Sequence, residues 1–140
     1  MHRTVAEGHR VLIIAPYGRD AESVSGLLLS QGYDTKICGT FAELAPLVDA
    51  HAGVILMTEE ALGGDTSALQ SALTAQPAWS DIPFILLFGR RAGCERPNEA
   101  VRRKLPPSAT NVVLLERPLS SESLLSTIAS AMRARQRQFL

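Results

Sequence analysis

Five stretches of the chain have the length and apolar character of strands, and segments with helical spacing separate them. Four of the stretches are almost continuously apolar, which is typical of strands covered on both faces. The second stretch alternates polar and apolar residues, and its Asp34 and Lys36 indicate a strand at the edge of a sheet. We predict strands at 10–15, 33–39, 52–58, 82–88 and 111–115.

The segments after the first two stretches contain start and stop signals for helices. Asp20 can cap a first helix, and Gly32 is placed to end it in the left-handed conformation. The run from Thr40 to Glu43 has the form of a capping box. Pro46 follows closely, so we expect the second helix to be short and either kinked or shifted.

Three further helices are predicted in the second half of the chain. Asp65 or Thr66 caps the third, residues 99–105 form a short fourth, and Ser120 caps the last. The last helix has an apolar stripe that should face the core: Leu124, Leu125, Ile128, Ala131 and Met132.

This alternation of strands and helices predicts one α/β domain. Apolar strands with helices between them indicate a doubly wound parallel sheet, and right-handed crossovers favour the flavodoxin-like (βα)5 order 2-1-3-4-5. We assign residues 1–9 to a polar tail, 10–132 to the domain and 133–140 to a C-terminal helix extension or linker. No glycine or proline ends that helix, so we expect it to run past the domain body towards a partner.

Composition argues against some classes of function but does not identify one. The chain has 140 residues with 14 basic and 14 acidic side chains, so its formal net charge is zero. The overall charge therefore gives no electrostatic attraction to nucleic acid or to an anionic membrane. The basic stretch 90–104 has no interleaved aromatic residues for base stacking. Cys38 and Cys94 fit neither a metal site nor a disulfide framework. The N-terminus lacks an apolar signal region, so we expect a cytoplasmic protein.

The strand ends carry a resemblance to a known family. Ligands of such sheets bind at the carboxyl ends of the strands. Over Arg10–Met132 the order of elements resembles the response-regulator receiver family. The most specific local matches are Ile82-Pro83-Phe84-Ile85-Leu86-Leu87, similar to the family's fourth strand, and Arg117-Pro118, similar to the lysine-proline pair after its fifth strand. The resemblance implies a phosphate-accepting aspartate after strand three, two acidic residues after strand one that help bind Mg²⁺, a hydroxyl after strand four and that lysine.

This sequence departs from the family at nearly all of those positions. The acidic pair falls on Ala15 and Pro16, the aspartate on Thr58, the hydroxyl on Phe88 and the lysine on Arg117. Only the cation is kept, and a Mg²⁺ site left with a single nearby carboxylate lacks the oxygen ligands that the metal needs. We therefore predict a degenerate pseudo-receiver that is not an enzyme and has no catalytic residues, metal or cofactor.

Three hypotheses follow for the function. The first is a non-phosphorylatable signalling module of a two-component phosphorelay system, binding a histidine kinase core or a second subunit, with a homodimer possible. The loop Pro77–Pro83 before the fourth strand and the run Leu114–Pro118 after the fifth also resemble phosphorylation-deficient receiver modules at the N-termini of hybrid sensor histidine kinases. The second is a small-molecule sensor whose pocket uses Tyr17, Glu59 and Arg117, with Thr58 and Phe88 beside them. The third is a receiver phosphorylated at an atypical residue.

One pair within this region has two interpretations. Glu59 can act as a permanent phosphate mimic that pairs with Arg117 through a charge-assisted bond. Alternatively, Glu59 is a solvated loop residue and Arg117 pairs with its neighbour Glu116.

Overall fold

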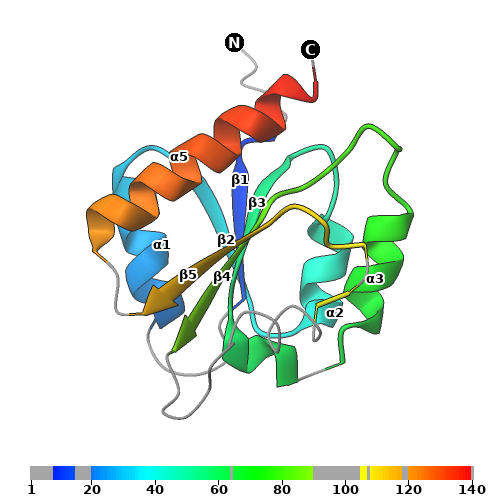
Figure 1. Ribbon diagram of the computed structural model, residues 1–140, viewed down its shortest axis with the longest axis horizontal. Helices are drawn as coiled ribbons and strands as arrows, with labels where there is room; N and C mark the ends of the chain where they lie inside the picture. Colours follow the sequence, from blue (N-terminus) through cyan, green and yellow to red (C-terminus); the bar gives the residue numbers. More distant parts are fainter. Residues whose placement is uncertain are drawn as a thin grey trace.

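Five parallel strands form the sheet at the centre of the structure (Figure 1). The computed structural model describes residues 8–14, 20–63, 65–89, 105–106, 108–117 and 120–139. The strand order is β2-β1-β3-β4-β5, and every neighbouring pair is parallel. The strands are β1 (Arg10–Ile14), β2 (Asp34–Cys38), β3 (Ala52–Thr58), β4 (Phe84–Gly89) and β5 (Val112–Arg117). This order confirms the predicted flavodoxin-like fold.

Helices cover both faces of the sheet. On one face lie α1 (Asp20–Ser30) and α5 (Ser121–Arg137); on the other lie α2 (Phe41–Leu44), the 3-10 turn η1 (Ala45–Leu47) and α3 (Ser67–Thr74) (Figure 1). A second 3-10 turn, η2 (Glu59–Gly63), follows β3 directly. The core forms two clusters, one under each layer of helices, and β1, β3 and β4 contribute alternate residues to each. This explains why these three strands are continuously apolar.

The predicted stop of the first helix and the predicted start of the second are confirmed, whereas Asp20, predicted as the first cap, is itself the first residue of α1. Gly32 has φ +88°, the left-handed conformation in which the chain turns after α1. The Thr40 hydroxyl accepts a 3.2 Å hydrogen bond from the backbone N–H of Glu43. The Glu43 carboxylate in turn accepts a hydrogen bond from the backbone N–H of Gly39. In the standard capping box the donor would be the N–H of the N-cap residue itself, which here is Thr40. Pro46 lies in η1, where the helix tightens after its single α-turn.

The strand ends differ in detail from the prediction. β4 begins at Phe84 rather than residue 82, because Pro83 has no N–H to donate to a neighbouring strand. β5 continues two residues beyond Leu115, because Glu116 and Arg117 pair with the end of β4. The predicted fourth helix lies outside the described residues except for its last residue, and Cys94 lies outside them too.

The end of α5 corrects the prediction for residues 133–140. Arg135 is fully buried, and Phe139 packs edge-on against Trp79 with ring centroids 5.1 Å apart. The last turn therefore packs on the domain, and the expectation that it runs past the domain body is wrong for residues 135–139. Helical periodicity shows which side of a helix faces inward, but it does not show that an arginine on that side finds buried acceptors.

Among the described residues, the structure contains no helix that is long and apolar enough to cross a membrane.

Candidate functional site

Thr58 occupies the last position of β3, where the resemblance implies an aspartate. It pairs in register with Leu87 of β4, and only 5% of its surface is exposed. Its surroundings are apolar: it lines a small cavity together with Ile13, Val24 and Leu87. A hydroxyl is tolerated in such a place, whereas a carboxylate would lose its hydration with no cation described beside it.

Phe88 occupies the position where the resemblance implies a hydroxyl. It is 5% exposed and belongs to the core cluster under α2 and α3, with Phe84 and Leu86. Thr58 borders a cavity that includes residues of α1, on the other face of the sheet. The two side chains therefore pack in different surroundings.

The cavity beside Thr58 is much smaller than a ligand site. Its volume is about 10 Å³, which is room for about one water molecule. Pockets for drug-sized ligands measure roughly 300–1,000 Å³. The cavity is lined by Ile13, Ile14, Ala21, Val24, Leu56, Met57, Thr58 and Leu87. The described residues around Thr58 therefore leave room for little more than a water molecule.

The acidic residues after β3 begin a 3-10 turn. Glu59 is half-buried and Glu60 is exposed, and both make contacts. Further along, hydrogen bonds from the backbone and side chain of Ser67 hold the pKa of Asp65 below its usual value. No group of three or more His, Cys, Asp or Glu side chains in the described part of the chain is placed to hold a metal ion.

Several predicted site residues lie outside the description. Ala15, Pro16 and Tyr17 belong to a stretch that the structure does not describe. The backbone of Arg117 pairs with Gly89, but its side chain is not described. The proposed pairing of Glu59 with Arg117, and the pocket formed with Tyr17, therefore remain predictions.

A polar cluster that the sequence pattern did not predict lies at the opposite edge of the sheet, where the strands begin. Arg135 is its centre, although the sequence places this arginine in a charged C-terminal tail. One signal was available: Arg135 lies three residues after Met132 and seven after Ile128, so it continues the inward stripe of α5.

Several solved structures resemble this chain at low sequence identity. A CheY-like response regulator receiver domain protein from Methanospirillum hungatei has a TM-score of 0.66 and 19% identity, over 92% of this chain and 97% of that one. The signal receiver domain of a signal transduction histidine kinase from Syntrophus aciditrophicus has a TM-score of 0.66 and 22% identity, over 90% and 91%. NtrX from Brucella abortus has a TM-score of 0.66 and 15% identity over 92% of this chain, which spans only 27% of the NtrX chain.

No protein-family model matches the chain, and no curated protein matches it. The structural likeness shows that the chain has the fold of receiver domains. The predicted receiver-like architecture is thus confirmed at the level of fold.

Proposed function

We propose that this chain is a receiver-like signalling module of a two-component system that cannot be phosphorylated and acts by binding a protein partner. The observation that carries the proposal is Thr58. This residue stands at the end of β3, buried among apolar side chains, where a phosphorylatable receiver carries its aspartate.

The chemistry of phosphoryl transfer supports this proposal. Transfer depends on positioning and on cations that neutralise developing charge, so an acceptor carboxylate and its Mg²⁺ are both required. At the described positions, Thr58 supplies a buried hydroxyl and Phe88 supplies a phenyl ring in the core. Ala15 and Pro16 supply no side-chain oxygen at the remaining positions.

Without phosphorylation, such a module would transmit a signal by binding a protein partner. The receiver resemblance implies docking through α5, β5 and the predicted fourth helix. β5 is an edge strand, and its Val113 is 38% exposed. The partner we propose is a histidine kinase core or a second copy of this chain. One similar structure is itself the receiver domain of a signal transduction histidine kinase.

Incubation with acetyl phosphate and with beryllofluoride, each with Mg²⁺, tests the loss of phosphorylation. We expect the intact mass and the amide chemical shifts to stay unchanged, while a phosphorylatable receiver treated in parallel changes in both. A stoichiometric aspartyl phosphate would contradict the proposal. Stable phosphate on another residue type would instead support the hypothesis of an atypical site.

Sedimentation velocity over a concentration series separates the two proposed partners. Association of the pure chain at micromolar concentration would identify a second copy as the partner. A monomer at all concentrations would leave a different protein, for which a histidine kinase core is the first candidate to titrate. If the pure chain stays monomeric and no kinase core binds, the proposal of a binding module fails.

A further inference from the structure

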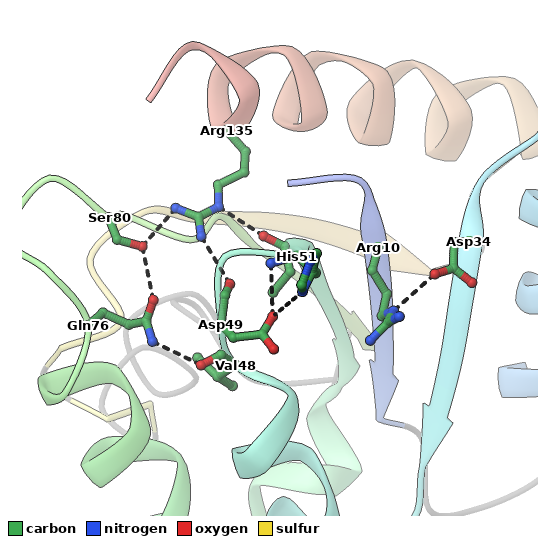
Figure 2. A network of polar contacts seen from close by, with 9 residues as sticks. Arg10, Asp34, Val48, Asp49, His51, Gln76, Ser80 and Arg135 are labelled. Atoms are coloured by element: carbon green, nitrogen blue, oxygen red, sulfur yellow. Dashed lines mark hydrogen bonds and ion pairs between the residues drawn. The ribbon is translucent and has the colours of Figure 1, made fainter. Parts of the chain in front are cut away.

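The guanidinium of Arg135 connects the end of α5 to the edge where the strands begin (Figure 2). Its Nε donates to the carbonyl of Ala52 at 2.9 Å, and Nη2 donates to the carbonyl of Asp49 at 3.3 Å. Its Nη1 donates to the hydroxyl of Ser80 at 2.8 Å and to the amide oxygen of Gln138 at 2.7 Å. One side chain thus connects α5 with β3, the turn before it and the loop before β4.

Two neighbours in the last turn bind that same loop. The amide of Gln138 accepts from the backbone N–H of Asp81 at 2.8 Å and donates to the Asp81 carbonyl at 2.7 Å. The ring of Phe139 lies 4.7 Å from the guanidinium carbon of Arg135 and meets Trp79 edge-on. Trp79 is 51% exposed, so this aromatic contact lies at the surface beside Arg135.

The two parts of α5 are held by different kinds of interaction. Leu124, Ile128 and Met132 bury apolar surface against the sheet, and this burial stabilises the helix. The four acceptors of Arg135 are neutral oxygen atoms. Burial lowers the pKa of the Arg135 guanidinium, and Asp81 and Asp49 only partly oppose that effect. The desolvation of a buried charge offsets much of what its hydrogen bonds contribute.

We propose that the last turn of α5 is a latch that closes over the loop 76–81 and opens as a unit while the sheet stays folded. Arg135, Gln138 and Phe139 are its contact residues. Local opening is expected where a segment makes few buried apolar contacts, because such segments have low opening free energies. A partner that binds this turn must release the loop 76–81 at the same time, because the partner and the loop would compete for contacts with Gln138 and Phe139.

Two reporters in the wild-type chain follow the latch directly. Trp79 is the only tryptophan in the sequence, so intrinsic fluorescence reports on its contact with Phe139. The amide hydrogen of Asp81 is bonded to Gln138, whereas that of Ile55 is bonded within the sheet to the carbonyl of Pro83. In urea we expect the fluorescence transition to precede loss of far-UV circular dichroism. We also expect Asp81 to exchange hydrogen faster than Ile55. Coincident transitions with equal protection of both amides would overturn the proposal.

A matched pair of variants tests the role of Arg135. Arg135→Ala removes the buried guanidinium, and Arg137→Ala removes an exposed arginine of the same turn. We expect Arg135→Ala to speed exchange at Asp81 on the order of tenfold, the loss of one or two net hydrogen bonds. Ile55 should speed by no more than the same factor, because global unfolding breaks the same contacts, and should remain better protected than Asp81. Arg137→Ala should change neither. No acceleration at Asp81 in Arg135→Ala, or equal protection of Asp81 and Ile55 in that variant, would overturn the latch. If Arg135→Ala does not fold, Phe139→Ala serves as the second variant with the same expected result.

Discussion

At the scale of single residues, the site depends on what Thr58 has around it. We expect Thr58→Asp to destabilise the domain, because a carboxylate among Ile13, Leu56 and Leu87 is desolvated and its pKa rises. A raised pKa means that the penalty grows as pH increases above the unfolded value of about 3.9. The loss should be small near pH 4 and roughly 1–3 kcal/mol at pH 7.

Urea unfolding of Thr58→Asp at both pH values measures this penalty, with Thr58→Val as the control of matched shape. The valine variant should remain close to wild type at both. A Thr58→Asp protein as stable as wild type at pH 7 would mean that a cation or solvent reaches this position.

Gly53 shows how closely α5 approaches the sheet. A Cβ at this position would lie 2.6 Å from the carbonyl of Gly8 and would collide with the sulfur of Met132. We expect Gly53→Ala to lower the free energy of unfolding by roughly 1–3 kcal/mol through overpacking. Gly26→Ala is the control, because a Cβ there meets nothing within 4 Å in the middle of α1. It should raise stability by about 0.5–1 kcal/mol. Thermal midpoints of the two variants that move in the same direction would contradict this packing.

At the scale of elements, the N-termini of α5 and α3 differ in their capping hydrogen bonds. The Ser120 hydroxyl accepts a 3.1 Å hydrogen bond from the N–H of Ser123, so Ser120→Ala should cost about 1 kcal/mol. Thr66 stands at the corresponding position of α3 without a side-chain cap bond, and Asp65 bonds the N–H of Ser67 instead. Thr66→Ala should therefore be nearly neutral. Denaturation followed by circular dichroism gives both values, and an equal loss in both variants would mean that the cap bonds are not what sets the difference.

At the scale of the whole molecule, the two layers of helices share the strands between them. Leu69 of α3 and Ile128 of α5 belong to different core clusters, and neither is exposed. We expect Leu69→Ala and Ile128→Ala each to lower the unfolding free energy by roughly 2–5 kcal/mol. Because both layers of helices pack on β1, β3 and β4, unfolding of one layer should also unfold the other.

Urea titrations of Leu69→Ala and Ile128→Ala, followed by circular dichroism, test this cooperativity. Each variant should give a single transition with an unchanged slope. A plateau between two transitions in either variant would mean that the layers fold independently.

The sequence by itself determined the order of the elements, the parallel sheet and the departures from the receiver pattern at Thr58 and Phe88. These follow from local causes: burial on both faces makes a strand apolar, and caps such as Ser120 act within one turn. The resemblance also located the candidate site on the strand ends, although the side chains of its residues 15–17 and Arg117 lie outside the description.

Only the tertiary structure decided which side chains meet across the chain. It placed Thr58 and Phe88 in separate surroundings and made Arg135 a buried residue rather than a charge on a free tail. The acceptors of Arg135 include Ala52 and Asp49, more than 80 residues away. Backbone carbonyls are common to all residues, so no pattern of side chains marks them as partners. Their availability depends on where neighbouring strands begin, and that is settled only when the sheet and α5 have packed together.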